Sequence, residues 1–155
     1  MRGRRPTIVQ VRSLSVNHIG LTVRDVERSV TFYRDVVGME LFSRRQMKGE
    51  WFDTLTHNHG AVIDVAMLRL GTFTLQLVQY LEAGGDVLPV AHHHVGNPHL
   101  CINVDDVEAF HAQATARGGL EPTPIVDILG SGIRSFYVRD PDGIPVEFLQ
   151  ERSPS

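Results

Sequence analysis

The chain has 155 residues, of which 42% are hydrophobic and 21% charged, and its formal net charge is −3. This length suits one domain, or two small modules that share a core. The negative balance argues against a general nucleic-acid binder, which needs a basic face for phosphates. The single cysteine excludes an intrachain disulfide. No apolar run has signal-peptide length or the roughly 18 residues of a membrane span, so we expect a cytoplasmic protein.

After a basic tail at residues 1–14, two segments repeat one pattern. NHIGLTVRDVERSVTFY spans residues 17–33, PHLCINVDDVEAFHAQA spans residues 98–114, and His18 aligns with His99. Each segment reads as a short alternating strand, then an aspartate that suits a helix N-cap, then an amphipathic helix. The chain therefore contains an internal repeat.

The later parts of the two repeats also correspond. LRLGTFTLQLVQY, residues 68–80, and FYVRDPDGIPVEFLQ, residues 136–150, both read as a strand, a tight turn and a strand. Matching LQLVQ to VEFLQ pairs Gln76 with Glu147. The first repeat is longer between its first and fourth strands, and we place the extra length around residues 49–60.

Each module is therefore strand–helix–strand–strand–strand, which predicts an α+β domain over residues 1–155. Module one spans 15–81, the linker 82–97, module two 98–151, and a short tail 152–155. The predicted elements are 15–23, 26–37, 39–47, 61–70 and 72–80, followed by 98–104, 107–117, 121–128, 133–139 and 145–150.

Alternation along the strands selects four polar residues. Side chains of a strand point alternately to opposite faces, so residues flanked by core-facing apolar neighbours point away from the helices. This argument places His18, Gln76, His99 and Glu147 on the uncovered side of the sheet. Two imidazoles, one amide oxygen and one carboxylate make a plausible ligand set for a divalent metal ion.

These motifs resemble the vicinal oxygen chelate superfamily, which includes glyoxalase I, methylmalonyl-CoA epimerase, extradiol dioxygenases, fosfomycin-resistance enzymes and bleomycin-binding proteins. The resemblance covers residues 15–151. It implies tandem βαβββ modules whose curled mixed sheets form a cleft, with metal ligands on the first and fourth strands of each module. Those positions are His18, Gln76, His99 and Glu147 here.

The resemblance implies a metal-dependent lyase or isomerase of the glyoxalase I or epimerase type. A zinc, nickel, cobalt, manganese or iron ion would carry a net charge of +1 with these ligands and would stabilise an enediolate of a substrate with adjacent oxygens. Glu147 is the candidate base, and Glu50 is a weaker candidate for a second one. A homodimer is expected, with the cleft either within one chain or between two.

Two other functions stay open. An iron-dependent dioxygenase would use His18, His99 and Glu147 alone, and a metal-free binding protein would sequester an aromatic or antibiotic ligand.

The remaining histidines are not expected to bind metal. We interpret His92, His93 and His94 as linker residues near the cleft mouth, and His57, His59 and His111 as surface or structural residues. Possible contacts of an anionic substrate are Arg44, Arg45 and Arg134, and possible cleft aromatics are Trp51, Phe52, Phe73 and Tyr80.

Overall fold

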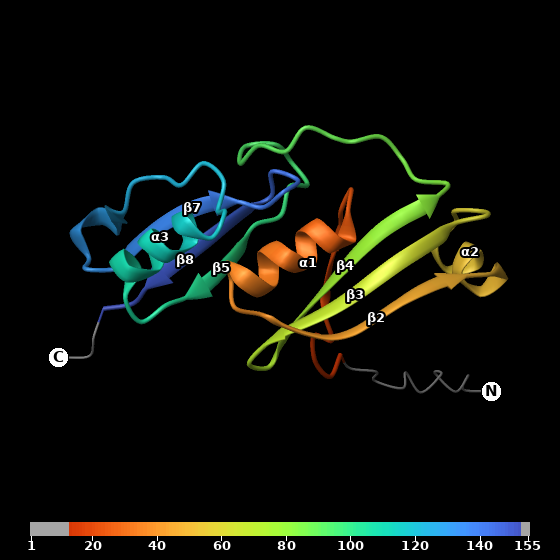
Figure 1. Cartoon of the computed structure of the whole chain (residues 1–155), viewed down its shortest axis with the longest axis horizontal. Helices are drawn as coiled ribbons and strands as arrows, with labels where there is room; N and C mark the ends of the chain where they lie inside the picture. The colour runs from red at the N-terminus through yellow and green to blue at the C-terminus, as the bar shows by residue number, and fades with distance from the viewer. Residues whose placement is uncertain (1–12, 153–155) are drawn as a thin grey trace, which may run out of the picture.

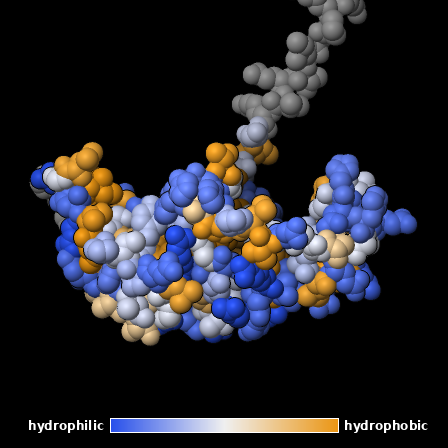
Figure 2. All heavy atoms as spheres, turned by 90° about the horizontal axis from the view of Figure 1, so that it is seen from above, coloured by the Kyte–Doolittle hydropathy of each residue, from blue (hydrophilic) through white to orange (hydrophobic). Residues whose placement is uncertain are grey.

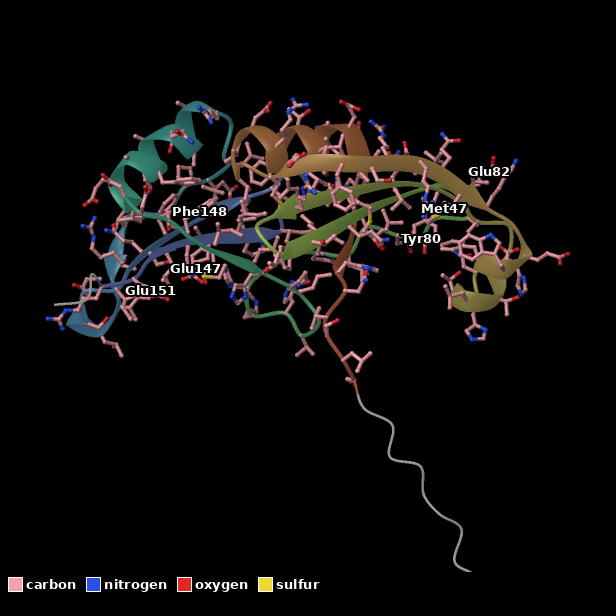
Figure 3. All side chains as sticks on the ribbon, turned by 90° about the horizontal axis from the view of Figure 1, so that it is seen from below. Met47, Tyr80, Glu82, Glu147, Phe148 and Glu151 are labelled. Carbon is pink, nitrogen blue, oxygen red and sulfur yellow. The ribbon has the colours of Figure 1, made fainter. Side chains whose placement is uncertain are left out.

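The computed structural model describes residues 13–152, so the basic segment 1–12 and residues 153–155 lie outside it. Two four-stranded sheets follow each other along the molecule, and each carries a helix on the same side (Figure 1, Figure 3). This is the predicted α+β arrangement of two tandem modules. No helix of residues 13–152 is long and apolar enough to cross a bilayer.

The first sheet is built from the first module. Its strands have the order β1-β4-β3-β2, with β1 parallel to β4 and the other pairs antiparallel. The elements are β1 (Ile19–Thr22), α1 (Val26–Asp35), β2 (Glu40–Lys48), α2 (Glu50–Thr56), β3 (Val62–Leu70) and β4 (Phe73–Glu82).

The second sheet repeats this plan with the order β5-β8-β7-β6, and β5 is parallel to β8. Its elements are β5 (Leu100–Asn103), α3 (Val107–Ala116), β6 (Val126–Asp127), the 3₁₀ turn η1 (Ile128–Gly130), β7 (Arg134–Arg139) and β8 (Pro145–Gln150). Each long helix begins where the sequence predicts: the carboxylates of Asp25 and Asp106 accept from the backbone amides of Arg28 and Ala109.

One hydrophobic core connects the two modules. Residues from both belong to the same buried cluster, including Val30 and Leu77 of the first module and Val107 and Phe148 of the second. At their junction, the hydroxyl of Tyr33 on α1 donates to a carboxylate oxygen of Asp140, in the turn between β7 and β8, at 3.1 Å.

The structure differs from the sequence expectation in three places. The insertion of module one forms the short helix α2, which was not predicted. The first strand begins at Ile19, although we expected residue 15, and β6 has only two residues of the range 121–128.

Figure 2 shows hydrophobic side chains gathered in separate patches, so the surface in that view carries no single large apolar area.

Candidate functional site

Strand register determines which side chains share a face. Gly20 of β1 pairs with Gln76 of β4, and Cys101 of β5 pairs with Glu147 of β8. The residues on either side of Gln76 and Glu147 point into the core beneath the helices. Gln76 and Glu147 therefore occupy equivalent positions on the side opposite α1 and α3, which we call the inner face.

The half of the site in module two is a compact polar group around Glu147. The side chain of Glu147 is 12% exposed, and its Oε2 lies 3.9 Å from Nε2 of the more exposed His99. Ser135 Oγ donates to Oε1 at 2.6 Å, and the Tyr137 hydroxyl donates to Oε2 at 2.8 Å. Both carboxylate oxygens thus accept a hydrogen bond from β7.

These contacts shift the pKa values of Glu147 and of two of its neighbours. Burial raises the pKa of Glu147, but the hydrogen bonds from Ser135, Tyr137 and Cys101, together with the nearby His99, outweigh it and hold the pKa below its usual value. Burial, with the nearby carboxylate, raises the pKa of Cys101 to about 11 and raises the pKa of Tyr137. At neutral pH Glu147 is therefore a carboxylate, and the Cys101 thiol and the Tyr137 hydroxyl beside it are neutral.

The half of the site in module one is less polar. The Gln76 amide nitrogen lies 3.6 Å from the sulfur of Met67. A Cβ built on Gly20 would lie 3.4 Å from Gln76 Oε1, so the amide oxygen lies over β1. His18 immediately precedes β1, two residues before Gly20, and its Nδ1 is 2.7 Å from the side-chain oxygen of Asn17. The amide oxygen and this imidazole are the two groups of this half that the sequence predicts as metal ligands.

The structure brings His99 to Glu147 and places Gln76 over the strand that His18 precedes, but it does not bring the two halves together. Residues 13–152 contain no group of three or more histidine, cysteine, aspartate or glutamate side chains placed to hold one metal ion. A site with all four candidate ligands would therefore need the two half-sites to meet, within one chain or between two.

Three residues near Glu147 were not selected from the sequence as part of the site. Ser135 and Tyr137 lie on β7, and their role depends on the pairing of Tyr137 with Glu147, which alternation alone does not reveal. His92 is the third: its ring packs edge-on against Tyr137, with centroids 4.6 Å apart, and lies 5.9 Å from the ring of His99. Asn97 donates to the carbonyl of Ala91 and so folds the linker at this point.

Several other candidates lie elsewhere. Arg44 and Arg134 pair with glutamates of α1 and α3, on the helix side of the sheets. His111 contacts the carbonyl of Thr123, which agrees with a structural role. Glu50 is exposed in the first turn of α2, and no hydrogen bond or ion pair joins it to the module-two group among the described residues.

The aromatic residues divide between the two faces. Phe73 packs against the main core and does not reach the inner face. Phe52 of α2 covers one end of the inner face, with Ala61, Ile63 and Val65 beneath it. Figure 3 shows Met47 and Tyr80 near α2, while Glu147 lies on the other sheet. The cluster around Phe52 is therefore in module one, and the Glu147 carboxylate is in module two.

Comparison with known proteins agrees with this fold. The family model of the Glyoxalase/Bleomycin resistance protein/Dioxygenase superfamily matches residues 15–148, and the chain belongs to this superfamily.

Two similar proteins are an epimerase and a lyase. A 2-epi-5-epi-valiolone epimerase from Actinomyces sp is 30% identical over 145 residues, covering 88% of this chain and 79% of that protein. A lactoylglutathione lyase from Haemophilus influenzae is 29% identical over 143 residues, covering 90% and 95%. A crystal structure of a glyoxalase family protein from Bacillus cereus matches with a TM-score of 0.80 at 18% identity, covering 95% of this chain and all of that one.

Proposed function

We propose that the protein is a metal-dependent isomerase or lyase of the glyoxalase I or epimerase type. The observation that carries the proposal is the pairing of His99 with Glu147 on the inner face, at positions equivalent to those of His18 and Gln76. The names of the epimerase and lyase relatives support the same class of reaction.

The donor atoms fit a divalent ion. Metal–ligand bonds to imidazole nitrogen and carboxylate oxygen are about 2.0–2.2 Å long, so two ligands of one ion lie no more than about 4.4 Å apart. The separation of 3.9 Å between His99 Nε2 and Glu147 Oε2 is within this limit. His18, Gln76, His99 and Glu147 would hold the ion, and the ion would supply a Lewis acid for two adjacent substrate oxygens.

Glu147 is the group of this chain that we assign to proton transfer. Its carboxylate lies on the inner face and would take a proton from the carbon next to a substrate carbonyl and return it to the product. Ser135 and Tyr137 keep the carboxylate on one side of the site, and His99 lies beside it. A carboxylate with fixed position reduces the cost of orienting the reacting groups.

We also propose that the working unit is a homodimer in which each site combines halves of two chains. Within one chain His18 does not join His99 and Glu147 in a cluster that could hold a metal ion. Strands β1 and β5 are the outer strands of their sheets, and each borders the ligand-bearing strand of its module. Two copies related by a twofold axis could bring these borders, and the half-sites beside them, together.

Elemental analysis of untagged protein tests the metal. We expect about one equivalent of zinc, nickel, cobalt or manganese per chain, lost in His99→Ala, and turnover lost in Glu147→Gln, with 2-oxoaldehyde–thiol adducts and acyl-CoA epimers as the first substrates. Stoichiometric iron would instead indicate a dioxygenase. Absence of metal after reconstitution would contradict the proposal and leave a ligand-binding cleft.

Mixing two inactive variants tests the shared site. His18→Ala and His99→Ala would each lack metal, but a mixed dimer would contain one intact site. Random exchange of subunits should restore about a quarter of the wild-type metal content. A monomer by light scattering, or no recovery after exchange is verified, would place each site within one chain.

A further inference from the structure

The carboxylate of Glu147 is held by two hydroxyl groups of the neighbouring strand. Ser135 Oγ contacts Oε1 at 2.6 Å and the Tyr137 hydroxyl contacts Oε2 at 2.8 Å. Ser135 is only 2% exposed, and the Glu147 side chain is 12% exposed. A carboxylate has about four acceptor positions, so the two hydroxyls do not use all of them. Two donors on β7 leave the carboxylate little freedom to rotate.

The internal repeat provides a comparison for this arrangement. Tyr137 lies opposite Glu147 in the register, and the equivalent residue opposite Gln76 is Met67. Two residues earlier on the same strands, Ser135 corresponds to Val65. The hydroxyl donors therefore accompany the charged ligand candidate, whereas apolar groups accompany the neutral one. An amide can be left beside a thioether at modest cost, but a partly buried anion needs donors.

We propose that Ser135 and Tyr137 are positioning residues that orient the Glu147 carboxylate toward an ion beside His99 and thereby set the affinity of the site for divalent metal. The inference depends on the proposed function, because it assigns these hydroxyls a role in the same site. Hydrogen-bond partners of metal ligands fix ligand geometry in advance, and their loss typically weakens metal binding about 10–100-fold. Neither hydroxyl is needed as a ligand for this effect.

The test compares hydroxyl-deletion variants of the full-length protein. Zn²⁺ affinity is measured by competition with a chromophoric chelator, and the absorption spectrum of bound Co²⁺ reports ligand geometry. We expect Tyr137→Phe and Ser135→Ala each to bind Zn²⁺ about 10–100-fold more weakly, with an altered Co²⁺ spectrum. Ser135→Thr, which keeps a hydroxyl, should retain most of the affinity. Tyr80→Phe, which removes a tyrosine hydroxyl from the inner face of module one, should bind as wild type.

The outcomes separate this inference from the proposed function. If the wild type binds Zn²⁺ and Glu147→Gln weakens binding, but Tyr137→Phe and Ser135→Ala bind as wild type, the positioning role is wrong and the metal site stands. If the wild type binds neither ion, both proposals are overturned. If Ser135→Ala does not fold, Tyr137→Phe alone decides, because it removes only one oxygen atom and leaves the ring. A Co²⁺ spectrum unchanged in Tyr137→Phe would also contradict the inference, because weaker binding with the same ligand geometry would indicate a general loss of stability and not a change in the position of the carboxylate.

Discussion

The hydrogen bond between Tyr33 and Asp140 should contribute measurably to stability, because it joins the two modules in the buried core. Both residues have no exposed surface, and the Tyr33 hydroxyl is 3.1 Å from Asp140 Oδ2. The other carboxylate oxygen accepts from the backbone amides of Asp142 and Ile144. The substitution Tyr33→Phe would therefore leave Oδ2 buried without its hydroxyl donor.

The expected cost follows from the chemistry of the two groups. Hydrogen bonds to charged groups contribute about 1.5–3 kcal/mol, and a buried acceptor without a partner carries a similar penalty. We expect Tyr33→Phe to lower the free energy of unfolding by about 1.5–3 kcal/mol. In a protein of this size that corresponds to a decrease in Tm of about 3–12 °C.

Urea titration and thermal unfolding, both followed by circular dichroism, measure the effect. Tyr80→Phe is the matched control, since the Tyr80 side chain is only partly buried and no hydrogen bond of its hydroxyl is found within residues 13–152. The variant Asp140→Ala completes a double-mutant cycle with Tyr33→Phe. A loss below about 0.5 kcal/mol in Tyr33→Phe, or a coupling energy near zero, would refute the reasoning.

The remaining predictions concern a titrating group, the linker and the insertion. Burial raises the pKa of Asp140 above its usual value of 3.8 despite the hydrogen bonds that it accepts. The contribution of Asp140 to stability should therefore be full below pH 3.8, fall as the pH rises through the folded-state pKa and then stay level. Asp140→Asn should remove this fall in a pH series of urea unfolding. His92→Ala should weaken Zn²⁺ binding, because the His92 ring contacts Tyr137. His93→Ala should not, since the His93 ring packs against His94. Equal Zn²⁺ affinities of the two variants would mean that His92 has no role beyond the linker. Phe52→Ala should cost about 3–5 kcal/mol in urea unfolding, and a loss under 1 kcal/mol would mean that α2 detaches easily.

Much of the fold could be predicted from the sequence because its signals are local. The alternation in the strands and the N-cap aspartates Asp25 and Asp106 are properties of a few neighbouring residues, and the structure confirms both the module plan and the helix starts. The repeat then related Gln76 to Glu147, and the registers Gly20–Gln76 and Cys101–Glu147 place these two side chains at equivalent positions.

The parts that were missed depend on tertiary contacts or carry weak signals. Helix α2 has seven residues, and its N-cap is Gly49 without a side-chain hydrogen bond, so neither periodicity nor capping indicated it. The environment of Glu147 depends on which residue of β7 lies opposite it. His92 reaches Tyr137 through a turn of the linker that Asn97 stabilises, and no periodic pattern predicts such a turn.

The parallel pairing of β1 with β4 and of β5 with β8 has a consequence for folding during synthesis. Parallel neighbours cannot be joined by a tight turn, so the first strand of each module cannot pair until the last strand of that module has been synthesised. At about 5–20 residues per second, β1 leaves the ribosome several seconds before β4 can pair with it. The strands that carry or follow the candidate ligands therefore come together only when the rest of the module has been made. A nascent chain that could capture metal would have to contain a completed module, and the candidate site would be the last feature of each module to form.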